Sequence, residues 1–276
     1  MSLKTYTKAD WSFAALKYTI LVLLLGMALL PFLYALSVSF RTPADFYGNP
    51  IWIPSEITLA PWGRAFNELR GTLMNSAMIA TGTAILSLLI TIPGAYVFGR
   101  KEFPGKEIAF YTIVLALLFP YILLIIPITD IWNSLGLWNT IPGLWIAYQV
   151  FVTPFAIWIL RDYFEKLPAN LEEAAQVYGC TQFTAFSRVI LPLSLPAIVA
   201  VGFLAFLTGW NDFLFSNLLT TGTGPRPAVV YMFVATAGGE TTYWAELMAS
   251  VLLIGAPPTA LYMVARRYLT SAFAVN

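Results

Sequence analysis

Few side chains in this sequence of 276 residues could perform covalent chemistry. The sequence contains no histidine, which excludes histidine-ligated haem or zinc, serine-type catalytic triads and histidine proton relays. Cys180 is the only cysteine, so no disulfide can form within the chain. Lys106 follows a glycine, but the preceding glycine is one residue too far away for a phosphate-binding loop. Glu107 also stands where such a loop holds magnesium through Ser or Thr. The residues therefore predict no catalytic centre, metal site or ATP site.

The most informative polar segment, residues 167–196, lies between two long apolar stretches. Asn170 is a suitable N-cap, and Glu173 three residues later gives a variant of the capping box. Gly179 suits the end of this helix, and Thr181 can cap a second one. The second helix is expected to place three apolar residues at helical spacing: Phe183, Phe186 and Ile190. By composition alone, the two helices could also rest as an amphipathic pair on a lipid surface.

The composition of the whole chain is that of an integral membrane protein. Hydrophobic residues make up 59% of the sequence and charged residues 11%, against roughly 25% charged residues in soluble domains. The mean hydropathy is +0.74. The net charge is +1 and no basic block is present, so we expect no nucleic-acid partner.

Six apolar stretches are long enough to cross a bilayer, which takes about 20 residues. They cover residues 18–40, 72–98, 108–129, 141–160, 193–219 and 245–264. The sequence therefore predicts an all-α membrane protein with six transmembrane helices. Residues 41–71 are expected to form a polar loop, and residues 220–243 a loop with one short helix near Val229. Prolines inside the stretches, such as Pro120, predict kinks.

The distribution of lysine and arginine predicts the orientation. Of the 15 such residues, 11 fall on the side of the two termini and of the segment 167–192. The other four are Arg41, Arg64, Arg70 and Arg226. Because cytoplasmic loops carry the excess of positive charge, we expect both termini and the segment to be cytoplasmic.

The spacing inside that segment resembles the EAA loop of the permease subunits of ABC importers. Glu173-Ala174-Ala175 is followed after three residues by Gly179, and after nine more by Val189-x-Leu191-Pro192. The resemblance implies that residues 167–192, between spans 4 and 5, form a coupling helix that docks in a cleft on the ATPase subunit. The residues that it assigns to docking are Glu172, Glu173, Ala174, Ala175, Tyr178, Gly179, Val189 and Pro192. Tyr178 replaces an acidic residue that is usual in the family, and Val189 replaces an isoleucine.

Other motifs resemble the carbohydrate branch of this family. They are Phe103-Pro-Gly-Lys106, Gly136-Leu-Trp-Asn-Thr140, Leu167-Pro168 and Trp210-Asn-Asp-Phe213. The similarity is to the smaller, six-span permease of maltose-type importers. It implies a single transmembrane permease domain over residues 1–276 with the MetI-like fold of type I importers. It further implies a second homologous permease, two ATP-binding subunits that hold the ATP and Mg²⁺, and an extracytoplasmic sugar-binding protein. The location would be the cytoplasmic (inner) membrane, and the solute a maltose- or trehalose-type sugar.

Asp212 is expected to have a specific role in such a permease, because a carboxylate at the end of a span is unfavourable in lipid. With Trp210 and Asn211 it could line a sugar path, or it could satisfy backbone groups at a helix end. Three more polar residues within the apolar stretches could face the path or make interhelical hydrogen bonds: Asn75, Gln149 and Thr153.

Three other functions are alternatives to a sugar permease. A permease for another solute, such as glycerol phosphate, would need a clustered basic pocket. A secondary transporter would leave the EAA-like spacing without a purpose. A membrane-embedded enzyme would need convergent acids, histidines or a nucleophile within the spans, and the sequence offers almost none.

Overall fold

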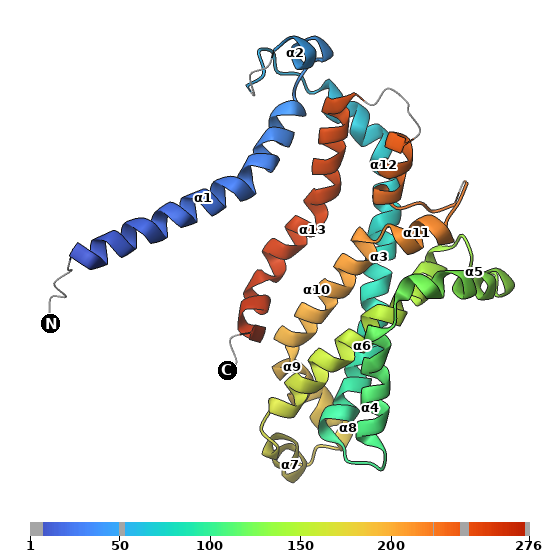
Figure 1. Cartoon of the computed structure of the whole chain (residues 1–276). Coiled ribbons are helices and arrows are strands. Elements are labelled where there is room, and N and C mark those ends of the chain that lie inside the picture. Colours follow the sequence, from blue (N-terminus) through green and yellow to red (C-terminus); the bar gives the residue numbers. More distant parts are fainter. Residues whose placement is uncertain (1–7, 50–52, 223, 238–242, 274–276) are drawn as a thin grey trace. The chain divides into compact units, whose positions relative to one another are not determined.

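A computed structural model of the chain describes residues 8–49, 53–222, 224–237 and 243–273, and all regular elements in these ranges are helical. Figure 1 shows their order along the chain. The chain divides into two compact units. Residues 1–68 and 239–253 form the first unit, and residues 69–238 and 254–276 form the second. Two long helices, α3 (Ala60–Arg100) and α13 (Trp244–Phe273), contribute residues to both.

The first unit begins with α1 (Lys8–Val38), whose described side chains are mostly apolar and exposed as far as Leu36. A helix with this surface is suited to lipid. The short helix α2 (Pro43–Gly48) follows, with Thr42 as its N-cap and proline at its first position. Asp45 is buried here. It accepts hydrogen bonds from Ser55 and Asn49, and it pairs with Arg41 at 3.6 Å.

The expectation of a polar loop over residues 41–71 is therefore wrong. This region contains α2, and α3 already begins at Ala60. The charged residues between 60 and 71 suggested a loop, but they lie on the exposed side of a helix. Ala65 and Leu69, four residues apart, are buried on its other side.

The second unit contains the remaining helices. Between α3 and α6 (Ile141–Lys166) lie α4 (Lys106–Leu115), η1 (Ala116–Leu118), η2 (Tyr121–Leu124) and α5 (Ile125–Ser134). After α6 come α7 (Asn170–Val177), α8 (Gln182–Ala185), the π-helical turn η3 (Phe186–Ile190) and α9 (Leu191–Leu193). The unit continues through α10 (Leu195–Asn211), α11 (Leu214–Leu219) and α12 (Ala228–Ala237), and α12 is the short helix predicted near Val229.

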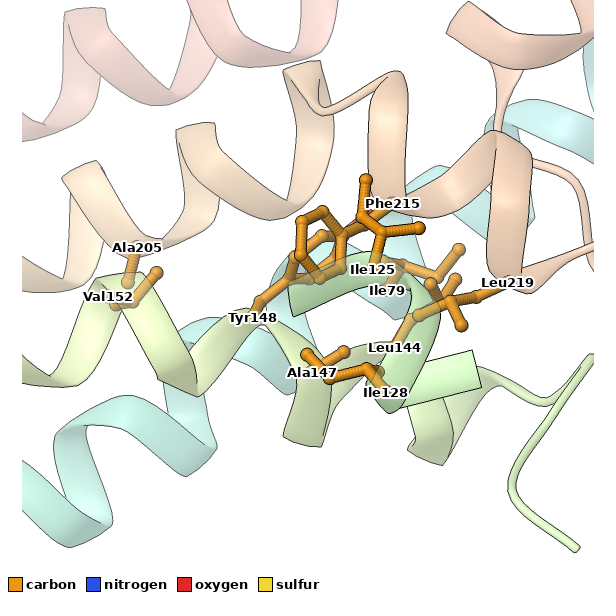
Figure 2. Packing of buried hydrophobic residues seen from close by; sticks show 10 residues of the cluster. All are labelled: Ile79, Ile125, Ile128, Leu144, Ala147, Tyr148, Val152, Ala205, Phe215 and Leu219. Carbon is orange, nitrogen blue, oxygen red and sulfur yellow. The ribbon is translucent and has the colours of Figure 1, made fainter. Parts of the chain in front are cut away.

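Helices α6 and α10 pack side by side in the second unit (Figure 1). Their contact holds two apolar clusters. One is drawn in Figure 2 and gathers residues of α3, α5, α6, α10 and α11 around Tyr148 and Phe215. The other surrounds Phe164 and Leu160, and includes Ile190 at the end of η3. Helix α10 also approaches α3 closely at Gly209, where a Cβ atom would lie 2.9 Å from Cα of Ala80. Such contacts between small residues are how helices pack in lipid.

By length and composition, the described residues contain four helices able to span a membrane, or six if each of two bent pairs is one span. The six predicted spans are the upper end of this range. The stretch 108–129 bends by 92° at Phe119 and Pro120. Phe119 is extended, as a residue before proline prefers to be. The other pair bends by 74° at Ser194, two residues before Pro196.

Candidate functional site

Residues 167–192 fold into a helix, a bend and a second helix, as predicted from their spacing. Gly179 has a φ of 85°, in the left-handed region, and follows the end of the first helix as predicted. Thr181 caps α8, since its side chain accepts a hydrogen bond from the backbone N–H of Thr184 at 3.2 Å. At 1.5 Å per residue, the eight residues of α7 extend about 12 Å, too short for a helix that is stable alone in water.

The predicted capping box at the start of α7 is wrong. Asn170 is already inside the helix, and the cap position is Ala169, whose side chain makes no capping hydrogen bond. A turn that joins the N–H of Leu171 to the carbonyl of Pro168 leads the chain into the helix. The two glutamates of the first turn, Glu172 and Glu173, instead favour the helix through its dipole.

The second helix differs from a regular one because five of its residues form a π-helical turn, from Phe186 to Ile190. A π turn takes more residues than an α turn and so shifts the faces that follow it. Phe183 was expected to share a face with Phe186 and Ile190. It is instead 76% exposed, whereas Ile190 is fully buried.

Glu172 faces the interior of the unit, where two cations of α3 and the adjoining loop meet it. Its Oε1 lies 2.9 Å from Nε of Arg100, and its Oε2 lies 3.3 Å from Nζ of Lys101. The hydroxyl of Tyr96 donates to Oε2 at 3.2 Å. Arg100 also donates to the carbonyls of Leu167 at 2.9 Å and Pro168 at 3.2 Å. Glu172 was predicted to dock on a partner, and in this structure its carboxylate is occupied within the chain.

These contacts set the charge state of the pair. Burial alone would raise the pKa of Glu172, but the hydrogen bond from Arg100 and the charges of Lys101 and Arg100 outweigh it, so the pKa lies below its ordinary value. Burial would likewise lower the pKa of Lys101. Its contacts with Tyr96 and Glu172 outweigh that effect, and the pKa is raised. Both groups are therefore charged at neutral pH.

The outer side of the loop carries most of the other predicted docking residues. Those exposed are Glu173, Ala174, Tyr178, Gly179 and Pro192, while Ala175 is buried and Val189 is half-buried. Val177 and Tyr178 are 85% and 88% exposed, and Phe183 of α8 is exposed as well. Sequence reasoning missed Val177 and Phe183 as surface residues. The feature of the sequence that could have indicated this surface is the apolar pair Val177 and Tyr178, which follows the polar residues of the first helix.

A cavity of about 330 Å³ opens near the end of α10. Its wall consists of Tyr121, Phe151, Thr208, Asn211 and Asp212. A second cavity of about 400 Å³ shares Phe151 and Thr208 with it and is otherwise lined by aliphatic residues and Phe155. Two of the predicted path residues, Asn211 and Asp212, line this cavity, and their role towards a solute stays a prediction. No pattern in the sequence indicated that Tyr121, Phe151 and Thr208 would line the same cavity.

Asp212 also has the structural role that was its alternative. Its Oδ2 accepts hydrogen bonds from the hydroxyl of Tyr148 and from the backbone N–H of Ser216, both at 3.0 Å. The hydroxyls of Tyr148 and Ser216 are hydrogen-bonded to each other as well. The carboxylate therefore holds the first turn of α11 and joins it to α6 while it lines the cavity.

The other predicted path residues lie away from this cavity wall. Trp210 is 2% exposed, and its indole N–H donates to the carbonyl of Ile254 at 3.1 Å. Asn75 donates to the carbonyl of Arg226 at 3.1 Å. Gln149 donates to the carbonyls of Trp145 and Thr83, and it accepts from Thr153 at 3.0 Å. Gln149 and Thr153 thus make the hydrogen bonds within and between helices that were their alternative to a place in the path, while Asn75 bonds to the loop before α12.

The helices described above are those of a multi-pass membrane protein. Residues 91–275 match the family described as "binding-protein-dependent transport system inner membrane component", and the chain belongs to this family.

Among curated relatives, the chain is 30% identical over 264 residues to the diacetylchitobiose uptake system permease protein NgcG of Streptomyces coelicolor, covering 94% of this chain and 87% of that protein. It is 36% identical over 200 residues to the trehalose transport system permease protein SugB of Mycobacterium tuberculosis, covering 72% and 73%. The fold resembles a chain of a bacterial ABC transporter that imports the acidic polysaccharide alginate, with a TM-score of 0.83, 22% identity and coverage of 97% and 100%.

Proposed function

We propose that this permease serves an ATP-driven importer of a di- or oligosaccharide and couples to a separate ATPase subunit through residues 167–192. The observation that carries the proposal is the surface of α7. Glu173, Ala174, Val177 and Tyr178 are exposed on a helix too short to be stable alone. Glu172 and Ala175 of the same helix are buried against the chain. A helix anchored on one side, with large apolar side chains on the other, is suited to receive a partner.

Two observations support the proposal that the solute is a sugar. Trehalose and diacetylchitobiose are named as the solutes of the two curated relatives. The 330 Å³ cavity also combines two aromatic rings, Tyr121 and Phe151, with polar groups of Thr208, Asn211 and Asp212. Sugar rings pack their C–H faces on aromatic side chains, while their hydroxyls bond to amides and carboxylates. Neither of the two cavities described above is lined by lysine or arginine, so nothing there favours a phosphorylated solute.

The chain would form half of the path and would not hydrolyse ATP itself. The sequence has no phosphate-binding loop, so ATP and Mg²⁺ would be bound by two ATP-binding subunits. A second homologous permease would complete the path, and an extracytoplasmic sugar-binding protein would deliver the solute. The excess of lysine and arginine supports an orientation in the cytoplasmic membrane with both termini and α7 on the cytoplasmic side.

Reconstitution tests the proposal directly. The chain is combined in liposomes with the second permease and the ATPase subunit of the same organism, and ATP hydrolysis is measured with and without sugar-loaded binding protein. Stimulation that disappears when Tyr178→Asp replaces the wild-type chain is the expected result. If the wild-type chain retains no ATPase subunit during purification, the proposed function is wrong.

A further inference from the structure

Two adjacent glutamates of α7 have opposite surroundings. Glu173 is exposed on the outer side of the helix. Glu172 is buried: its Oε1 meets Arg100, and its Oε2 meets both Lys101 and the hydroxyl of Tyr96. The sequence assigns both to one docking surface, and the structure separates them into an outer and an inner carboxylate.

Arg100 is the residue that makes the inner contact more than a single ion pair. It is the last residue of α3, and its side chain is only 8% exposed. Its guanidinium donates to Glu172 of α7 and, through its other nitrogens, to the carbonyls of Leu167 and Pro168, where α6 ends. One planar group with five fixed donors thus joins the ends of three helices in a defined geometry.

Tyr96, whose hydroxyl donates to Glu172, also contacts the second helix of the loop through its ring. The ring of Tyr96 lies with its centroid 4.5 Å from that of Phe186 in η3 and 6.1 Å from that of Phe164 in α6. Helix α7 also packs against η3, which leads through α9 into α10. A displacement of α7 therefore has two routes into the helices of the unit. One runs along the chain to α10, and the other runs through Glu172 and Arg100 to α3.

We propose that Glu172 and Arg100 are positioning residues that transmit the movement of α7 to α3, and that Glu172 takes no part in docking. The inference rests on the proposed function, in which α7 is the docking helix. An apolar pair would fill the same space with equal or greater stability, because burying two charges is unfavourable. Charge-assisted hydrogen bonds also have preferred directions, so that a rotation of α7 would rotate the end of α3 with it.

The test compares two substitutions that remove the same charge from the same turn. Glu172→Gln removes the inner carboxylate, and Glu173→Gln, as the matched control, removes the outer one. Each variant is reconstituted with the second permease, the ATPase subunit and the binding protein. Three quantities are measured: the amount of ATPase subunit that co-purifies, the rate of sugar uptake, and the number of ATP molecules hydrolysed per sugar.

For Glu172→Gln we expect normal co-purification, uptake about tenfold lower, and more ATP hydrolysed per sugar, since coupling between sites is typically worth a factor of 5–150. Glu173→Gln should weaken co-purification and leave the ATP used per sugar by the assembled complex unchanged. Arg100→Gln should reproduce Glu172→Gln, and the double variant should be no worse than either, because residues acting through one contact are not additive.

Each other outcome has a definite meaning. If co-purification of Glu172→Gln falls in proportion to its uptake, Glu172 acts in docking or folding and the inference is wrong. Unchanged uptake and unchanged ATP use per sugar would also overturn it. Additive losses in the double variant would show that Arg100 and Glu172 act separately. Failure of the wild-type chain to retain the ATPase subunit is the distinct result that refutes the proposed function.

Discussion

The hydroxyl of Tyr148 lies 3.0 Å from Oδ2 of Asp212, and this hydrogen bond joins the middle of α6 to the turn between α10 and α11. Tyr148 is fully buried, whereas Asp212 also reaches the cavity wall. The two residues therefore allow the structural role of the carboxylate to be separated from its role towards the solute.

Tyr148→Phe removes the hydrogen bonds that the hydroxyl makes with Asp212 and Ser216, without changing the cavity wall. We expect it to lower the free energy of unfolding by about 1–3 kcal/mol, as the loss of two hydrogen bonds does. Asp212→Asn keeps the size of the side chain but removes the charge from the cavity, and it should reduce uptake or change the preferred sugar. Thermal unfolding in detergent and uptake kinetics with several sugars distinguish the two effects. Wild-type kinetics for a well-expressed Asp212→Asn would leave the carboxylate with its structural role alone.

Gly179 provides a test of the bend after α7. Valine at this position would have to adopt a φ of 85°, which is unfavourable for a side chain by roughly 1–2 kcal/mol. Gly179→Val should therefore weaken retention of the ATPase subunit while the chain still inserts into the membrane. Gly179→Asn is the matched control, because asparagine tolerates the left-handed region. The prediction is checked by co-purification from membranes, and equal retention by both variants would contradict it.

The exposed pair Val177 and Tyr178 should contribute to docking through apolar contact. Burying a large apolar side chain is worth roughly 1.5–3 kcal/mol, so Val177→Asp should weaken binding of the ATPase subunit by tenfold or more. Gln176→Asp is a control on the same turn, since it introduces the same charge at an exposed polar position. Binding is measured by titration of the purified ATPase subunit. Similar losses in both variants would attribute the effect to charge.

The contact of Glu172 predicts a dependence of stability on pH. Because its pKa is lower in the folded protein than in the unfolded chain, its contribution is complete above its ordinary value of 4.5 and is lost as the pH falls through the lower, folded value. Wild type should therefore unfold at a higher temperature than Glu172→Gln at pH 7, and this difference should shrink when the pH is lowered below about 4. A difference that is independent of pH would show that the charge of Glu172 is not what stabilises the loop.

The orientation can be tested with single cysteines in a Cys180→Ser background. The side chain of Glu102 is 90% exposed on the predicted cytoplasmic side, and Ile57 is exposed on the predicted outer side. A membrane-impermeant maleimide should label Ile57→Cys in intact cells, and Glu102→Cys only after the membrane is opened. Labelling in the reverse order would invert the predicted topology.

Much of the fold followed from patterns that are local in sequence. The apolar stretches, the bend at Gly179 and the cap at Thr181 depend on propensities and hydrophobicity that a few neighbouring residues determine. Helix α3 was predicted to begin too late because charged residues on one exposed side concealed the spacing of Ala65 and Leu69. The π turn at Phe186 was missed because it has no comparable sequence signature.

The candidate site was only partly predictable for a different reason. The spacing identified α7 as the exposed element, but it could not show that Glu172 would turn inward, because Arg100 lies 72 positions earlier in the chain. The cavity was not predictable for the same reason. Tyr121 and Phe151 meet Asp212 through the packing of α6 and α10 and the break before η2. Contacts between residues far apart in sequence decide both features.

The apolar side chains on the outside of the loop also bear on how the protein is produced in the cell. If α7 docks an ATPase subunit as proposed, a copy inserted into the membrane before that subunit arrives would leave Val177, Tyr178 and Phe183 exposed to water. Surplus copies would associate with one another or be degraded. The proposed docking therefore predicts that the two subunits must be made in balanced amounts, and overproduction of the permease alone should yield aggregated material.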